Sequence, residues 1–387
     1  MKNLLVWLIA VLLVPLSVFS QKLQVYKPQK FHRDIPAGNY SGLTALGNVC
    51  YAGGYGLTTL GKESNGGSGE KGAVGKKSDG GDGGMGAVGK KSDGGDGGMG
   101  AVGKESDSGD GGMRTVGKDR YAVVCDKTAD GFYLFHIDID SAKMRIKSVS
   151  NEGFMASGLP NRDQEGIAYN PYTQTIFISG EADDQVIEYT LDGKRTGRQL
   201  EMPQWMNRAR KNYGLESLCY DSDSHTYWTV TERPIQGEDE LRLLAFDDSL
   251  HEAGHCLYHL DEPQRHYLRG VHLLGVSAIV PTIGGHLLVL ERELRVPPLK
   301  IGSYCVTKLY DVTPRRDGSM IEKRLVGRWK TRMNLIRQNM ANYEGMSVVR
   351  RESGGRILLL LIADSQNRRS GLMRDWLRLV SLDYQND

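Results

Sequence analysis

A short motif recurs five times along the chain and limits its fold more than any other feature. Each copy opens with Ser or Glu, continues with a small residue and then has Leu, Ile or Met. The copies are Ser41-Gly42-Leu43, Glu165-Gly166-Ile167, Glu216-Ser217-Leu218, Ser277-Ala278-Ile279 and Glu344-Gly345-Met346. A unit that recurs in this way indicates a repeat architecture, in which neighbouring units stack to bury a common core.

Each motif is followed, after a turn-rich gap, by an apolar run that ends on a carboxylate. The runs end at Asp126, Glu181, Glu232, Glu291 and Asp364. Segments of alternating polarity complete each unit, with hairpin signals such as Asp192-Gly193 between them. About four short strands per unit predict an all-β fold, a β-propeller of five or six four-stranded blades. The alternating residues 22–26 are expected to complete the last blade, and repetition of the whole strand set argues against a pair of β-sandwiches.

A glycine-rich array at residues 58–118 interrupts the first unit. Its repeat is fourteen residues long, as in Gly72 to Met85 and again in Gly86 to Met99. Aspartates among the glycines suggest calcium repeats, but the known calcium solenoid has a nonapeptide period. Glycine loses more conformational entropy on ordering than other residues, and this array has little apolar surface to offset that loss. We therefore predict a disordered loop extruded from the first blade.

Length and charge exclude several classes of protein. The chain has 387 residues, 39% of them hydrophobic, and a formal charge of +2, which gives no electrostatic case for binding nucleic acid or an acidic membrane. Residues 1–20 have the pattern of a cleaved signal peptide, and their apolar run is short for a membrane span. We expect a monomer, secreted or periplasmic, with its propeller domain in residues 21–387. The five cysteines are an odd number and form no disulfide framework.

The repeated carboxylates are the candidate functional groups. In a propeller, equivalent positions of successive blades surround one axis, so the repeat predicts two rings of acidic side chains. The candidate catalytic residues are Glu165, Glu216, Glu344 and Arg162. The candidate metal ligands are Glu181, Glu232, Glu291 and Asp364. Clustered carboxylates need Arg, Lys or a hard cation such as calcium, and Arg233, Arg292 and Arg295 also lie beside these positions. An equal alternative is that each carboxylate accepts backbone hydrogen bonds at a strand end.

One segment matches the zinc-protease pattern HExxH, namely His251-Glu252-Ala253-Gly254-His255. That chemistry needs a helix, which places both histidines on one face. Here the segment joins two alternating runs, and Gly254 weakens a helix further. The sequence therefore predicts a hairpin turn and no zinc site.

Several of these segments resemble the bacterial phytase-like family that is described as having esterase-like activity. The resemblance is carried by Arg162-Asp163-Gln164-Glu165-Gly166, Ile178-Ser179-Gly180-Glu181, Ser277-Ala278, Leu290-Glu291-Arg292-Glu293, Asn342-Tyr343-Glu344-Gly345-Met346 and Asp364-Ser365-Gln366-Asn367. It covers nearly the whole mature chain except the glycine-rich array. It implies a secreted propeller with phosphoesterase or carboxylesterase activity, and the alkaline phytases are calcium-dependent propellers.

Two functions are compatible with these features. The leading hypothesis is a calcium-assisted hydrolase of phosphate or carboxylate esters, in which the acidic rings bind the metal and activate water. The alternative is a non-catalytic propeller that binds a sugar, a peptide or a phosphorylated ligand at the same face. A purely structural interaction module ranks third.

Overall fold

The computed structural model describes residues 22–47, 51–52, 119–209, 213–263, 265, 267, 269–333, 338–352, 354–368 and 373–383. Two compact units are distinguished: residues 1–54 with 115–387, and residues 55–114. The second unit, the whole glycine-rich array, Cys50 and residues 1–20 lie outside the described residues. The predictions for them therefore stay predictions.

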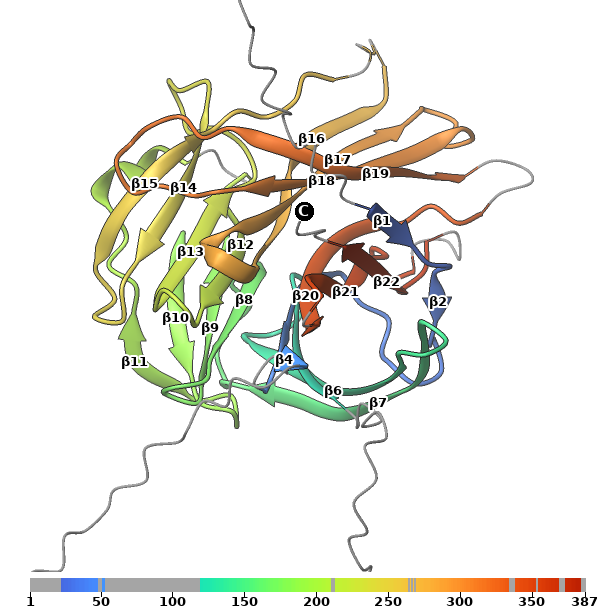
Figure 1. Cartoon of the computed structure of the whole chain (residues 1–387), viewed down its shortest axis with the longest axis horizontal. Helices are drawn as coiled ribbons and strands as arrows, with labels where there is room; N and C mark the ends of the chain where they lie inside the picture. Colours follow the sequence, from blue (N-terminus) through green and yellow to red (C-terminus); the bar gives the residue numbers. More distant parts are fainter. Residues whose placement is uncertain are drawn as a thin grey trace, which may run out of the picture. The chain divides into compact units, whose positions relative to one another are not determined.

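The first unit consists of five antiparallel sheets, which form the blades of a propeller (Figure 1). Blade 1 contains β3 (Tyr40–Ala45), β5 (Asp119–Cys125), β6 (Gly131–Asp140) and β7 (Arg145–Ala156). Blade 2 contains β8 (Gln164–Asn170), β9 (Thr175–Gly180), β10 (Gln185–Tyr189) and β11 (Arg195–Gln199). Blade 3 contains β12 (Leu215–Asp221), β13 (Thr226–Thr231), β14 (Leu241–Phe246) and β15 (Glu252–Tyr258). Blade 4 contains β16 (Val271–Pro281), β17 (Leu287–Val296), β18 (Ser303–Val312) and β19 (Lys323–Met333).

Blade 5 combines the two ends of the described chain. It contains β20 (Asn342–Glu352), β21 (Arg356–Asp364), β22 (Trp376–Asp383) and β1 (Lys22–Val25). Strand β1 pairs antiparallel with β22, beside which it lies in Figure 1, and β2 (Gln29–Lys30) also pairs with β22. The short β4 (Tyr51–Ala52) pairs parallel with β20. The prediction that the N-terminal strand completes the last blade is confirmed.

The ring is closed by the first strand of each blade. Strand β3 packs on β8, β8 on β12, β12 on β16, β16 on β20, and β20 again on β3. The sequence left five or six blades open, and the structure has five.

The repeated motif lies on these innermost strands, and each copy forms a β-bulge. The pairing register shifts at the motif between Tyr40 and Gly42 in blade 1, and equivalent shifts occur in the other four blades. A bulge adds one unpaired residue and re-aims its side chain. The bulged residue of each blade is therefore the Ser or Glu that opens the motif.

The small residue of the motif is needed because the innermost strands approach one another closely. A Cβ on Gly42 would lie 2.6 Å from the backbone oxygen of Glu165. A Cβ on Gly166 would lie 2.5 Å from the backbone nitrogen of Leu218. The two serines at the bulges join neighbouring blades, since Ser41 donates to the Gln164 carbonyl at 2.6 Å and Ser277 to the Tyr343 carbonyl at 3.0 Å.

Apolar layers between the blades form the core. One layer joins blades 1 and 2 through Val124, Phe132, Ile167 and Ile178, and another joins blades 4 and 5. Tyr40 and Tyr343 are fully buried, so both pack between blades. The described cysteines Cys125, Cys219, Cys256 and Cys305 are buried and free.

The HExxH segment is not a helix, but the hairpin turn lies earlier than the sequence predicted, because most of the segment belongs to a strand. Glu252 to His255 belong to β15, and His251 lies at the preceding turn, where its Nδ1 is 2.8 Å from Glu201. The 3₁₀ helix η1 spans Gln204–Arg208. A second 3₁₀ turn, η2, spans Ile283–Gly285. Among the described residues, no helix is long and apolar enough to span a membrane.

Candidate functional site

Two rings of equivalent positions surround the axis at one end of the innermost strands. The bulged positions are Ser41, Glu165, Glu216, Ser277 and Glu344. The other ring lies on the second strand of each blade. The residue just before each bulge pairs with one residue of the second strand, and the ring position is the residue that follows this partner in the sequence. Those positions are Asp126, Glu181, Glu232, Arg292 and Asp364.

The second ring corrects the sequence analysis in blade 4. Val276 pairs with Glu291, so the register places Arg292, and not Glu291, in the position of the other run-end carboxylates. The error arose because the apolar run ends at Leu290, whereas β17 continues to Val296. Glu291 instead accepts from the Tyr258 hydroxyl at 2.7 Å and pairs with Lys323 at 2.5 Å. It therefore takes part in a separate ion-pair group of blade 4.

Arg292 binds carboxylates of both neighbouring blades. Its guanidinium lies 3.1 Å from Glu216 and 3.0 Å from Glu232, both of blade 3, and it also pairs with Glu344 of blade 5. The Arg292 side chain is 8% exposed, and the two blade 3 carboxylates are each 6% exposed. Asn342 donates to Glu344 at 2.7 Å and orients it. Two predicted catalytic residues and one predicted metal ligand thus share a single buried cation.

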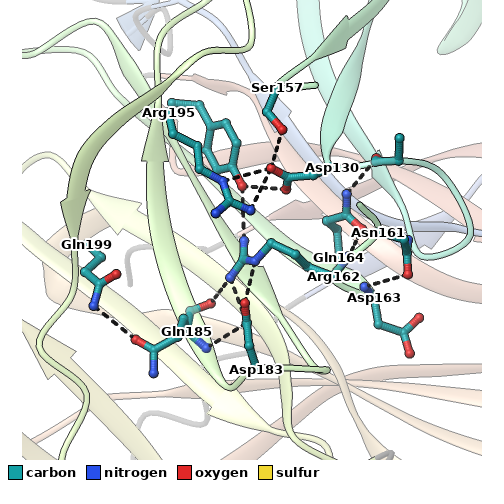
Figure 2. Close-up of polar contacts among 12 residues, drawn as sticks. Asp130, Ser157, Asn161, Arg162, Asp163, Gln164, Asp183, Gln185, Arg195 and Gln199 are labelled. Carbon is teal, nitrogen blue, oxygen red and sulfur yellow. Dashed lines mark hydrogen bonds and ion pairs between the residues drawn. The ribbon is translucent and has the colours of Figure 1, made fainter. Parts of the chain in front are cut away.

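Arg162 is held away from the acidic side chains. Figure 2 shows its guanidinium on Asp183, with Nε and Nη2 at 2.7 and 2.8 Å from the carboxylate oxygens. The same group donates to the Tyr189 hydroxyl at 3.1 Å, and that hydroxyl donates to Asp130. Arg195 completes the network on Asp130, while the Asp163 carboxylate points away from it in Figure 2. The Nε, Nη1 and Nη2 atoms of Arg162 thus all donate to partners within blade 2.

A second acidic group lies between blades 1 and 2. Carboxylate oxygens of Asp126, Asp163 and Glu165 lie within 4.8 Å of one another. Glu165 is 9% exposed, and among the described residues its carboxylate has no hydrogen-bond or ion-pair partner. One oxygen of Asp126 and the amide oxygen of the adjacent Asn39 are also buried without a partner. The Asp126, Asp163 and Glu165 carboxylates thus offer oxygen ligands close together, which is the arrangement that a hard cation requires.

A strained loop places Asp163 in this group. Its backbone has a φ of 55°, in the left-handed region that non-glycine residues seldom adopt. The Asn161 side chain accepts from the Asp163 amide at 3.0 Å, and the Asp163 carbonyl accepts from the Glu181 amide at 2.9 Å. Sequence reasoning missed Asp163, Asn39 and Lys127 as site residues because none belongs to a repeated position. The one available signal was the place of Asp163 within Arg162-Asp163-Gln164-Glu165.

Burial and mutual repulsion shift the pKa values of these carboxyls upward. Burial, followed by the charges of Glu216 and Asp126, raises the pKa of Glu165 well above its usual range. Burial also raises the pKa of Glu216 despite the opposing effect of Arg292. Burial raises the pKa of Glu181 to about 7 and that of Asp364 to about 6. The eight carboxylates that face this end, which we call the acidic end, are Asp126, Asp163, Glu165, Glu181, Glu216, Glu232, Glu344 and Asp364.

The channel behind the acidic end is closed. All five motif copies line a cavity of about 10 Å³, which has room for at most one water molecule. This cavity is too small to admit a substrate.

The family of the chain follows from its sequence. A family model described as phytase-like, "esterase-like activity of phytase", matches residues 108–366, more than half of the 387 residues. The chain belongs to this phytase-like family. This phytase-like protein thus has an esterase-like family domain on a five-bladed propeller. A comparison with curated proteins found no match.

Solved structures resemble the phytase-like protein only remotely. A levansucrase mutant of B. megaterium is 9% identical with a TM-score of 0.38, over 71% of this chain and 82% of that one. A Bacteroides thetaiotaomicron protein of unknown function is 9% identical with a TM-score of 0.35, over 68% of this chain and 56% of that one. A DUF4221 family member from Bacteroides vulgatus is 10% identical with a TM-score of 0.34, over 70% and 91%. These likenesses carry no functional argument.

Proposed function

We propose that this phytase-like protein hydrolyses phosphate or carboxylate esters at its acidic end with the help of a bound divalent cation, calcium. The observation that carries the proposal is the buried Glu165 carboxylate, which faces Asp126 and Asp163 without a cation of its own. The acidic end has two halves in this respect. Arg292 neutralises the half formed by Glu216, Glu232 and Glu344, whereas the other half has no buried counterion among the described residues.

The donor set fits calcium. Asp126, Asp163 and Glu165 offer only carboxylate oxygens. The neighbouring Asn39 donates through Nδ2 to Asp126 Oδ2 at 3.4 Å, and its amide oxygen is buried without a partner. Calcium takes six to eight such oxygen ligands in flexible geometry, while zinc prefers nitrogen and sulfur. A cation held here would polarise an ester oxygen and lower the pKa of a bound water.

The chain itself supplies a candidate general base. Glu181 belongs to the same acidic end, and burial raises its pKa to about 7. A base is most effective when its pKa lies near the working pH. Its Oε1 accepts from the Gly214 amide at 3.1 Å, which fixes one oxygen and leaves the other for a water molecule. We assign Arg292 a positioning role, because its guanidinium is already paired with Glu216, Glu232 and Glu344.

A turnover panel tests the proposal. Purified protein is assayed on carboxylate esters and phosphomonoesters with calcium and with chelator, beside the variant Glu165→Gln. We expect hydrolysis that needs calcium and falls at least about 100-fold in Glu165→Gln, the scale of losing a metal or a catalytic group. Ile283→Ala, at an exposed site of blade 4, is the control and should keep full activity.

Two results would contradict this function. Turnover that is unchanged by chelator or by Glu165→Gln would show that the cation takes no part in the reaction. Absence of turnover on every ester, together with measurable binding of a sugar, peptide or phosphorylated ligand, would favour a non-catalytic propeller.

We also propose that the protein is an exported monomer, processed after residue 20, with residues 58–118 as a loop. The leader-like pattern of residues 1–20 supports export. N-terminal sequencing of protein from the culture medium or periplasm tests this, and an intact N-terminus would contradict it.

A further inference from the structure

Lys127 is the only described cation that pairs with the Asp126, Asp163 and Glu165 group. Its ammonium lies 2.9 Å from Asp126 Oδ2 and 2.9 Å from Asp163 Oδ1. It therefore bridges two of the three carboxylates and leaves Glu165 without a partner. The buried oxygen of Asp126 that has no partner is the one that Lys127 does not contact.

The Lys127 side chain is 54% exposed, whereas the Asp126 and Asp163 side chains are 17% and 26% exposed. The ammonium thus reaches into the acidic group from the solvent side. An ion pair of an exposed lysine is weak in water, so the lysine can leave for water at little cost. A divalent cation within reach of all three carboxylates would gain more than the single positive charge it replaces.

A cation and Lys127 cannot both bind these oxygens. The three carboxylates lie within 4.8 Å of one another, so a cation at about 2.3–2.6 Å from each would occupy the same space as the ammonium. The two positive charges would also repel each other.

We propose that Lys127 is a built-in competitor of the divalent cation, which holds Asp126 and Asp163 in place in the ion-free protein and is displaced when the cation binds. This inference rests on the proposed cation site and describes its regulation. Lys127 therefore sets the cation concentration at which the site fills, and it keeps the acidic group from repelling itself apart when no cation is present.

Binding of calcium measured by titration calorimetry, and of terbium by its luminescence, tests the inference without any assay of activity. The variant Lys127→Met removes the competitor and keeps most of the side-chain volume. We expect calcium to bind about threefold to thirtyfold more tightly to Lys127→Met than to the wild type, the range for losing one or two exposed ion pairs. Lys127→Arg retains a competing charge and should stay within about threefold of the wild type.

Lys147→Met is the matched control, because Lys147 belongs to β7 of blade 1 and lies 3.8 Å from Asp138. It removes the same net charge, and the wild-type affinity should persist. Equal tightening in Lys147→Met and Lys127→Met would overturn the inference, as would unchanged or weaker binding in Lys127→Met. Absence of binding to every variant would instead contradict the proposed cation site itself. If calcium binds to Lys127→Met and to no other variant, the inference is supported, because Lys127 then excludes the cation from the wild-type site.

Discussion

Arg292 is the residue on which the acidic end depends. Four of the five blades have a carboxylate at its position, and blade 4 alone has a cation there. Because Arg292 reaches Glu216 and Glu232 on one side and Glu344 on the other, it joins blades 3, 4 and 5 by charge. The asymmetry leaves the half of the acidic end near blades 1 and 2 available to a cation from solution.

Replacing Arg292 should destabilise the protein strongly. Arg292→Gln leaves Glu216, Glu232 and Glu344 buried without a counterion, and breaking a buried ion pair typically costs about 3–5 kcal/mol. The free energy of unfolding, measured with urea at pH 8 in chelator, should fall by that amount. The deficit should shrink at pH 5, because burial raises the pKa of Glu216 and this carboxyl then takes up a proton. Arg332→Gln, at an exposed arginine of the same blade, is the control, and a loss below about 1 kcal/mol in Arg292→Gln would contradict this role.

The raised carboxyl pKa values predict that the ion-free protein is more stable at mildly acidic pH. Burial raises the pKa of Glu181 to about 7 and those of Asp364 and Asp184 to about 6. The folded state then binds more protons than the unfolded state between about pH 4 and 7, so stability is present below the ordinary pKa and is lost as the pH rises through 6 and 7.

The measurement is the Tm in chelator between pH 5 and pH 8. We expect a fall of several degrees over this range and a flatter profile for Glu181→Gln, which cannot lose a proton there. A Tm that rises from pH 5 to pH 8 would contradict the assigned environment of these carboxyls.

At the scale of the element, the bulged innermost strand explains the repeated motif. The Ser or Glu is the bulged residue, and the small residue lets the neighbouring strand approach. The sequence was therefore sufficient to predict the blades and the place of Glu165, Glu216 and Glu344 around one axis. It was not sufficient in blade 4, because the end of the apolar run at Leu290 is not the end of β17. Only the pairing register shows that Arg292 lies in the ring.

The loop residues of the site were not predictable for a different reason. Asp163 reaches Asp126 and Glu165 through a left-handed backbone conformation and an Asn161 side-chain hydrogen bond. Neither feature leaves a periodic pattern in the sequence. Arg162, in contrast, was conspicuous in the sequence, but Asp183 and Tyr189 occupy it within blade 2.

Enlarging the small residue of the motif should separate two blades. In Gly166→Ala the new Cβ would lie 2.5 Å from the Leu218 backbone nitrogen, so β8 and β12 must move apart. Overpacking of this kind costs about 1–3 kcal/mol. Gly47→Ala is the control, because no atom lies within 4 Å of its Cβ position. Equal stability of the two variants in urea unfolding would show that the innermost strands have room to spare.

At the scale of the whole molecule, the pairing of β1 with β22 joins the two ends of the described chain in blade 5. Removal of residues up to 30 deletes β1 and β2 and leaves the edge of β22 unpaired. An exposed edge strand promotes association with other chains. We expect this truncation to lower the Tm and to form oligomers in size-exclusion chromatography, whereas a chain that begins at residue 22 should stay monomeric. A monomer of unchanged Tm after the longer truncation would contradict this role of the pairing.

The formal charge of the chain hides how unevenly its charge is distributed. The net value is +2, yet eight carboxylates gather at one end of the ring with Arg292 and Lys127 as their described counterions. This concentration of negative charge supports the proposal that a cation and an ester bind at this end of the ring.

The measurement that tests this account most directly is anomalous diffraction from crystals soaked in terbium or calcium. We expect an anomalous-density peak among Asp126, Asp163 and Glu165, at about 2.3–2.6 Å from their carboxylate oxygens. The Lys127 ammonium should then have moved away from Asp126 and Asp163. A crystal at saturating cation with no peak there, and with Lys127 still bridging Asp126 and Asp163, would contradict this account.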